Sequence, residues 1–350
     1  MKLLIAGLRQ KLPLLTEFGN TLTKFGINYK IVTESESSNR NYFYHIKRLL
    51  LTTRKFNKIL NEFQPDAVFI DSPHYFGFFV PKLKIPMFIY LRGDYWSETK
   101  WARDTLFKLP PLRLAFWLIN KNAEKSIKQA STIIPICNYL AEITRQHYPQ
   151  KSIEILYNGI SPSLWYQVEK MELKHPCVGL LQDPNIWGKT REMFTLTKVL
   201  ESMPDVTFYW VGDGPYKDKV LPTLQKYKNF KWLGYLKYPE EIRKFLGTID
   251  VYALVSGIDM APSTLLEAQL MERPVVCTKV GGIPELMEDG KTGYLVKKGD
   301  ADDLIKKLSI LLDDDAKAKQ MGKEARRFVE KNFTWDIIAK RFSDILKSKV

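Results

Sequence analysis

Two acidic residues, Asp259 and Glu267, flank a segment that favours the start of a helix. Pro262 fits the first helical position. The amides of Ser263 and Thr264 would then point out of the helix N-terminus, which attracts phosphate groups. Because carboxylates repel phosphate, we expect the two acids to accept hydrogen bonds from hydroxyl groups, such as those of a sugar. The alternative is that Asp259 caps a turn and Glu267 pairs with a surface lysine.

Two glycine-containing turns in the same half of the chain follow short apolar runs. They are Gly212-Asp213-Gly214 and Gly281-Gly282. Glycine at the carboxyl end of a strand lets the backbone approach a ligand closely. An ordinary strand-to-helix connection also uses glycine, so neither turn identifies a site by itself.

Short apolar runs that alternate with amphipathic stretches define the elements that position these residues. The runs cover residues 3–7, 29–33, 67–70, 87–91, 132–136 and 153–157, and then 177–181, 207–211, 230–233, 251–255, 274–278 and 293–296. Strands alternating with helices predict right-handed βαβ units whose ligands lie at the carboxyl ends of the strands. We therefore expect an α/β protein with two doubly wound parallel sheets.

The length of 350 residues and a polar junction near residues 167–174 divide these elements between two domains. We expect an N-terminal Rossmann-like domain over residues 1–166 and a C-terminal one over residues 167–334. The last helix, over residues 335–350, is expected to pack back on the first domain. Two such domains facing each other form a cleft lined by strand ends, where we expect the chemistry.

The composition is that of a folded protein, because 45% hydrophobic and 26% charged residues leave no room for a long disordered tract. Cys137, Cys177 and Cys277 are far apart among apolar neighbours, so we expect buried thiols and a reducing compartment. Neither a disulfide framework nor a metal site is predicted, because the paired spacings that they need are absent. The apolar run 114–119 is too short to cross a bilayer, which needs about 20 residues.

The net charge of +14 is concentrated in residues 1–170, which hold 24 Lys and Arg against 13 Asp and Glu. Cations alternate there with aromatic and aliphatic residues over 42–60 and 101–128. Such basic amphipathic segments suit an anionic ligand or membrane surface, and solvated faces of ordinary helices are the alternative. We expect a cytoplasmic protein, peripheral on the inner face of the membrane. Nucleic acid is not expected as a partner, because no nucleic-acid module accompanies the charge.

The motifs of the second half resemble those of the family 4 glycosyltransferases, retaining enzymes with the GT-B fold. The resemblance rests on Leu-Leu-Glu-Ala at 265–268, Arg-Pro-Val-Val at 273–276, Gly-Gly-Ile-Pro-Glu at 281–285 and Asp-Gly-Lys-Thr-Gly at 289–293. Further matches at 158–160, 212–215, 233–235 and 333–335 extend it over most of the chain. It implies two Rossmann-like domains facing across a cleft, which agrees with the order of elements.

The resemblance implies a donor site for a nucleotide sugar in the C-terminal domain. Glu267 would contact the nucleotide ribose, and Asp259, which replaces the family's first glutamate, would reach toward the donor sugar. The residues expected to surround the donor are Gly212, Asp213, Gly214, Leu233, Gly234, Tyr235, Met260, Ala261, Pro262, Ser263 and Thr264. Met260-Ala261-Pro262 stands where the family commonly has Gly-Phe-Gly.

A cationic clamp for the leaving diphosphate is the second implied feature. Lys189 matches the family's lysine, whereas the arginine that usually follows the glycine of the first strand is absent after Gly179. We expect Arg191 to substitute for it. Each preorganised contact to the developing charge is worth about 3–4 kcal/mol. Lys189, Asp259 and Glu267 are therefore the residues expected to carry catalysis.

The acceptor side is expected at strand ends of the N-terminal domain. Arg92 stands where the family has a histidine and is followed by Asp94, and Arg9 and Lys11 follow the first strand. These cations suit a phosphorylated or lipid-linked glycan acceptor, although exposed surface charge is the commoner role of a single lysine.

The resulting hypothesis is transfer of a sugar from a nucleotide diphosphate to an acceptor hydroxyl with retention of anomeric configuration. No metal or other cofactor is expected, because the helix dipole and the cations replace it. The altered first acid and the missing arginine leave one alternative, a catalytically weak or inactive GT-B protein that binds a nucleotide or sugar for a partner.

Overall fold

The computed structural model describes residues 1–35, 44–71, 73, 76, 85–105, 107 and 109–350. It divides the chain into two compact units, one of Met1–Gly159 with Trp335–Val350 and one of Ile160–Thr334. The first unit ends at Gly159 rather than at residue 166, because the next residues pair with the second unit. Ile160 N donates to Phe333 O at 2.9 Å, and Arg326 Nη1 donates to Trp165 O at 3.1 Å.

The first unit is built on a parallel sheet with the strand order β2-β1-β3-β4-β5-β6. The strands are β1 (Lys2–Gly7), β2 (Asn28–Thr33), β3 (Ala67–Asp71), β4 (Met87–Leu91), β5 (Thr132–Pro135) and β6 (Ser152–Ile153). The helices are α1 (Leu12–Thr23), α2 (Tyr44–Phe63), α3 (Tyr95–Thr105), α4 (Pro110–Gln129) and α5 (Asn138–His147), with a 3-10 turn over Arg9–Lys11. Strands β3 and β4 are buried along their whole length, as in sheets covered on both faces.

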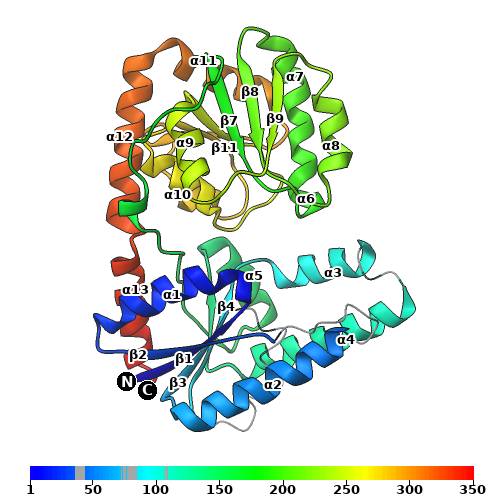
Figure 1. Ribbon diagram of the computed structural model, residues 1–350, viewed down its shortest axis with the longest axis vertical. Helices are drawn as coiled ribbons and strands as arrows, with labels where there is room; N and C mark the ends of the chain where they lie inside the picture. The colour runs from blue at the N-terminus through cyan, green and yellow to red at the C-terminus, as the bar shows by residue number, and fades with distance from the viewer. Residues whose placement is uncertain (36–43, 72, 74–75, 77–84, 106, 108) are drawn as a thin grey trace. The chain divides into compact units, whose positions relative to one another are not determined.

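The last helix, α13 (Trp335–Lys347), belongs to the first unit although it ends the chain. Figure 1 shows it beside α1. Phe18 of α1 packs against Trp335 and Phe342 with ring centroids 5.8 and 5.4 Å apart. Phe342 also meets Phe69 of β3 at 5.1 Å. The apolar side of α13 is therefore buried between α1 and the sheet.

The second unit repeats the architecture with the strand order β12-β11-β10-β7-β8-β9 (Figure 1). The strands are β7 (Cys177–Leu181), β8 (Thr207–Val211), β9 (Phe230–Gly234), β10 (Val251–Leu254), β11 (Val275–Thr278) and β12 (Gly293–Val296). The helices are α6 (Trp187–Thr190), α7 (Leu196–Ser202), α8 (Lys217–Leu224), α9 (Glu240–Thr248), α10 (Ser263–Leu270), α11 (Ala301–Asp313) and α12 (Asp315–Asn332). Short 3-10 turns cover Pro162–Leu164, Arg191–Thr195 and Ile283–Glu285.

The strand order of each sheet reverses at one point, between β1 and β3 in the first unit and between β7 and β10 in the second. The connections leave these neighbouring strands in opposite directions, so a crevice opens at the carboxyl ends of the strands, where doubly wound folds bind ligands. In the second unit this point is flanked by α6, which follows β7 and carries Lys189, and by the loop after β10, which carries Asp259.

The expected fold class is confirmed, because both sheets are parallel and doubly wound and every predicted run contributes a strand. The run at 153–157 contributes least, since β6 covers only Ser152–Ile153. Among the described helices, none combines the length and the hydropathy needed to cross a bilayer. The three cysteines, all within the described residues, are buried and form no disulfide.

Candidate active site

The loops that follow β7 and β10 meet at the switch point of the second sheet. Lys189 Nζ donates to Asp259 Oδ2 at 2.5 Å. The loop after β10 is also joined to the backbone of α6, because Gly257 N donates to Lys189 O at 3.0 Å. The side chains of Lys189 and Asp259 are 21% and 14% exposed, so the pair is shielded from bulk solvent but open to a ligand. Two of the predicted catalytic residues are thus in contact.

The helix that bears the second acid, α10, begins one residue later than expected. Pro262 is its N-cap, with an extended ψ of 117°, rather than its first helical residue, and no described side chain caps this end. The amides of Ser263 and Thr264 therefore lead the helix, as the prediction requires. The buried Tyr252 fixes this end, since its Oη lies 2.9 Å from Thr264 Oγ1. Uncapped amides at a helix N-terminus suit a phosphate group.

Glu267 is a buried carboxyl group, with only 3% of the residue exposed. Burial raises its pKa to about 7, and hydrogen bonds from the hydroxyls of Ser263 and Tyr238 oppose this rise. Such a group is costly to ionise in the empty protein and gains from any ligand that donates hydrogen bonds to it. The alternative, in which Glu267 pairs with a lysine on the surface, is therefore excluded.

Glu267 lines a cavity of about 190 Å³ at the carboxyl edge of the second sheet. The other lining residues are Leu181, Asp183, Val211, Gly212, Tyr235, Leu236, Tyr238, Ile242, Ser263 and Thr264. Aromatic and aliphatic walls with one buried carboxyl group and the hydroxyls of Tyr235, Tyr238, Ser263 and Thr264 suit a planar ring joined to a hydroxylated group. A nucleoside has this chemistry.

The two predicted glycine turns have different reasons for glycine. A Cβ on Gly212, at φ +145°, would lie 2.2 Å from Gln182 O, and Gly212 also lines the cavity. A Cβ on Gly281, at φ +54°, would lie 1.9 Å from Asp259 O. Gly282 N donates to the same Asp259 oxygen at 2.9 Å. The first turn forms the cavity wall, whereas the second supports the loop that carries Asp259.

The remaining residues predicted to surround the donor are placed unevenly. Tyr235 lines the cavity, and Asp213 pairs with Lys217 at 3.1 Å. Six others, Gly214, Leu233, Gly234, Met260, Ala261 and Pro262, are not among the described residues that line the cavity. The last three belong to the loop between Asp259 and α10, which adjoins the cavity. Their contact with a donor stays a prediction.

Two further cations, Arg191 and Lys298, are candidates for the cationic clamp that would hold the leaving diphosphate. Arg191 is exposed and begins the 3-10 turn after α6, so its substitution for the missing arginine stays a prediction. Lys298 was not singled out from the sequence, yet its Nζ donates to Gly257 O at 3.0 Å, in the loop that precedes Asp259. The sequence could have indicated Lys298, because it follows the predicted strand at 293–296 and so lies at the ligand-binding edge of the sheet.

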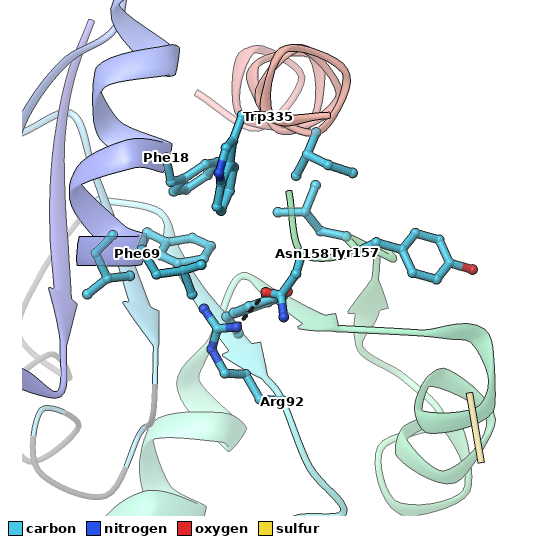
Figure 2. Close-up of a pocket in the computed structure, with 11 residues that line it drawn as sticks. Phe18, Phe69, Arg92, Tyr157, Asn158 and Trp335 are labelled. Carbon is cyan, nitrogen blue, oxygen red and sulfur yellow. Dashed lines mark hydrogen bonds between the residues drawn. The ribbon is translucent and has the colours of Figure 1, made fainter. Parts of the chain in front are cut away.

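Arg92 lies in a buried polar cluster at the carboxyl ends of β3 and β4. Its Nε contacts both oxygens of Asp71 at 2.8 and 3.0 Å, and its Nη1 donates to Asn158 Oδ1 at 2.5 Å. Figure 2 shows Arg92 pointing at Asn158 beside a small cavity that Phe18 and Trp335 also line. Asp71 is fully buried, so its charge largely cancels that of Arg92. Asp71 was not singled out from the sequence, although it directly follows the predicted strand at 67–70.

The other acceptor-side residues have separate surroundings. Burial lowers the pKa of Lys11, and the nearby Arg92 lowers it further, so Lys11 lies within reach of the same cluster. Arg9 is exposed on the adjoining 3-10 turn. Asp94 caps α3, accepting hydrogen bonds at 3.2 Å from two amides of its first turn. Contacts of these residues with an acceptor stay predictions.

One group of side chains that the sequence analysis did not connect lies at the opposite edge of the second sheet. His175, Cys177 and Asp250 present one ligand atom each, and these atoms lie within 4.8 Å of one another. The absence of paired cysteine spacings led to the expectation of no metal-ligating set. The fold brings Asp250 to the start of β7 from a distant part of the sequence, which a search for paired cysteine spacings does not detect.

Two family models match the chain. One, described as Glycosyltransferase Family 4, matches residues 14–164, and the other, described as Glycosyl transferases group 1, matches residues 176–314. Together they cover most of both units.

Curated relatives include enzymes that act on sugars. The chain is 25% identical over 237 residues to N-acetyl-alpha-D-glucosaminyl L-malate synthase of Bacillus anthracis, covering 65% of this chain and 62% of that protein. It is 32% identical over 174 residues to the GDP-mannose-dependent monoacylated alpha-(1-6)-phosphatidylinositol monomannoside mannosyltransferase of Corynebacterium glutamicum. This match covers 46% of this chain and 44% of that protein. It is also 32% identical over 151 residues to sulfoquinovosyl transferase SQD2 of Arabidopsis thaliana, and this match covers 42% of this chain and 29% of that protein. The matched part is therefore less than two thirds of each of these relatives.

Solved structures match over nearly the whole chain. Sucrose-phosphate synthase from Thermosynechococcus elongatus superposes with a TM-score of 0.79 at 15% identity, covering 99% of this chain and 98% of that one. Anabaena HepE in complex with UDP-glucose gives a TM-score of 0.71 at 17% identity, covering 99% and 100%. At these identities the likeness shows a shared fold.

Proposed function

The chain belongs to the family 4 glycosyltransferases, also called glycosyl transferases group 1, and has the GT-B fold. From this premise we propose that it transfers a sugar from a nucleotide-diphosphate sugar to an acceptor hydroxyl. The transfer proceeds with retention of anomeric configuration and without a metal ion, as the family resemblance implies. The observation that carries the proposal is the convergence of Lys189, Asp259, Glu267 and the start of α10 at one edge of the second sheet.

The geometry supports a division of roles among these residues. The nucleoside occupies the cavity beside Glu267, whose carboxylate accepts hydrogen bonds from the ribose hydroxyls. The diphosphate lies against the amides of Ser263 and Thr264, which carry the positive end of the helix dipole. Lys189 then faces the bond that breaks, where negative charge develops on the leaving diphosphate. Asp259 exchanges its contact with Lys189 for a hydroxyl of the donor sugar.

Incubation with a panel of nucleotide sugars tests this proposal. We expect one donor to bind and to release its nucleoside diphosphate, slowly with water and faster with an accepting glycan, and we expect EDTA to leave the initial rate unchanged. The anomeric coupling constant of the product reports retention. If no donor binds and none is turned over, the proposal is wrong. Binding of a donor without any release would favour the alternative of a non-catalytic binding protein.

We propose that the acceptor is a lipid-linked glycan and that the enzyme meets it at an anionic membrane surface. Helix α4 of the first unit supports this, because Leu114, Trp117 and Leu118 are exposed at 59%, 53% and 39% on its outer side. Arg113 is exposed beside them, and Lys121 Nζ lies 4.8 Å from the Trp117 ring. Exposed apolar side chains mixed with cations suit the boundary between lipid headgroups and acyl chains. Residues 42, 43, 106 and 108 of the two basic stretches lie outside the described residues.

Flotation with liposomes tests the membrane surface. We expect binding to vesicles with anionic lipid and much weaker binding to neutral vesicles. Each cation near an anionic surface contributes about 1 kcal/mol, so Arg113→Ala with Lys121→Ala should weaken binding about 30-fold. The control is Lys226→Ala with Lys228→Ala, which removes the same charge from exposed positions of the second unit. Equal losses in both double variants would assign the effect to net charge and overturn the α4 surface.

A further inference from the structure

His175, Cys177 and Asp250 form a compact polar group at the amino edge of the second sheet, at the other end of the strands from the donor cavity. His175 Nδ1 lies 2.8 Å from Asp250 Oδ2 and 3.6 Å from Cys177 Sγ. The side chains of His175 and Asp250 are 43% and 38% exposed, whereas Cys177 is fully buried. The function proposed above uses none of these three residues.

The backbone fixes the group in place. His175 and Cys177 lie on either side of Pro176 where the chain enters β7, and Asp250 is the last residue before β10. These strands are neighbours, with Val178 paired to Val251. Cys177 N donates to Asp250 Oδ2 at 2.7 Å, and Asp250 N donates to Cys177 O at 3.2 Å. The three side chains therefore hold their relative positions without a ligand.

The arrangement does not suit a nucleophilic cysteine. In a relay of thiol, imidazole and carboxylate, the thiol and the carboxylate contact different ring nitrogens of the histidine. Here Cys177 Sγ and Asp250 Oδ2 both approach Nδ1 of His175. Burial also raises the pKa of Cys177 to about 12, so the free thiol stays protonated at neutral pH. Sulfur, nitrogen and oxygen instead lie within 4.8 Å of one another.

We propose that His175, Cys177 and Asp250 bind a divalent transition-metal ion, with Zn²⁺ as the ion that their donor set favours. Imidazole, thiolate and carboxylate are all zinc ligands, and thiolate with imidazole selects zinc over magnesium or calcium. With Zn–S about 2.3 Å and Zn–N about 2.0–2.1 Å, a tetrahedral site places sulfur and nitrogen about 3.6 Å apart. The distance from Cys177 Sγ to His175 Nδ1 is 3.6 Å.

The oxygen ligand requires a small movement. A tetrahedral site separates the nitrogen and oxygen ligands by about 3.3 Å, whereas His175 Nδ1 and Asp250 Oδ2 are hydrogen-bonded at 2.8 Å. The metal therefore replaces this hydrogen bond and widens the pair by about 0.5 Å. Both side chains are partly exposed, so they can turn by this amount without disturbing the core.

The fourth position of the metal opens into a groove. A cavity of about 650 Å³ is lined by His175 and Asp250 together with Lys170, Glu272, Arg273 and Lys319. Three protein ligands and one open position, filled by water, form a complete four-coordinate site. Lys170, Arg273 and Lys319 are positively charged and oppose a cation in this groove. The Nε and Nη1 of Arg273 donate to Met271 O and Ile249 O, so its guanidinium is engaged by the backbone.

Metal binding to the purified 350-residue chain tests the proposal. After treatment with a chelator and its removal, titration with Zn²⁺ should show one bound ion per chain. Titration with Co²⁺ should produce a thiolate-to-cobalt charge-transfer band and the visible absorption of four-coordinate cobalt. Neither signal depends on glycosyltransferase activity, so the result is independent of the function proposed above.

Substitutions separate this site from adventitious binding. Cys177→Ser should abolish the charge-transfer band, and His175→Gln should weaken Zn²⁺ binding by more than about 100-fold, since even partners of a ligand cost 10- to 100-fold. Asp250→Asn keeps an oxygen for the Cys177 amide and should also weaken binding. Cys277→Ser is the matched control, because Cys277 is equally buried in a strand. Absence of the band in the unsubstituted chain, or its persistence in His175→Gln at equal affinity, would overturn the proposal.

Discussion

Replacing Lys189 with alanine is expected to lower kcat by about 10²- to 10³-fold, with a much smaller effect on binding of the nucleotide. A preorganised donor facing developing charge contributes on this scale, and it contributes more in the transition state than in the ground state. Lys189 Nζ is held 2.5 Å from Asp259 Oδ2 in a partly shielded site, so it is already oriented before the donor arrives. Steady-state kinetics with the best donor of the panel, and nucleotide titration by calorimetry, measure the two effects separately.

A cycle of variants separates two explanations of that loss. Lys189 could act on the leaving diphosphate, or it could only neutralise Asp259. In the second case Lys189→Met combined with Asp259→Asn would be no slower than Asp259→Asn alone, because no unpaired carboxylate remains beside the diphosphate. We expect the double variant to stay as slow as Lys189→Met alone. Lys198→Ala, which breaks the exposed pair with Asp302, is the matched control and should leave the rate unchanged.

Replacing Glu267 with glutamine is expected to weaken nucleotide binding about 10- to 100-fold and to stabilise the empty protein. A hydrogen bond to a charged group contributes about 1.5–3 kcal/mol, and the neutral amide loses this contribution. The free energy of unfolding should rise because the buried carboxyl no longer has to ionise. Its pKa changes from 4.5 to about 7 on folding, which corresponds to about 3 kcal/mol at most.

The pH dependence of both effects follows from the sign of this shift. A carboxyl whose pKa is raised by folding costs nothing below pH 4.5, costs increasingly more up to pH 7 and costs the full amount above it. The stability gain of Glu267→Gln should therefore be seen at pH 8 and vanish near pH 4. Nucleotide binding to the unsubstituted chain, which needs the carboxylate, should be about tenfold weaker at pH 6 than at pH 8.

Denaturant unfolding and nucleotide titration at these pH values check the second prediction. Glu288→Gln is the control, because Glu288 pairs with Lys291 on the surface and should change neither quantity measurably. Loss of stability in Glu267→Gln at pH 8, or nucleotide binding as tight as in the unsubstituted chain, would contradict the assigned role of Glu267.

The periodicity of the sequence was sufficient for the fold because the strands of a doubly wound sheet are buried on both faces. Runs such as Thr207–Val211 are therefore almost continuously apolar and stand out from the helices between them. The shortest strand, β6, was predicted least well, since two paired residues leave little signal. The boundary between the units was missed for a different reason. Residues 160–166 are held to the second unit by Ile160 and Trp165, whose partners, Phe333 and Arg326, lie far along the chain.

The sequence by itself determined the two sheets and the helix start at Pro262 to within one residue, whereas its placement of Asp259 and Glu267 at one ligand site stays a prediction. These follow from local patterns, in which the spacing of residues sets what a strand end or a helix can present. Only the tertiary structure decided that Lys189 faces Asp259, that Glu267 is buried with a raised pKa, and that Arg92 is neutralised by Asp71. The same holds for the meeting of His175, Cys177 and Asp250. Contacts between neighbouring parallel strands join residues that are distant in the chain, and burial depends on everything packed around them, so neither is written in any local pattern.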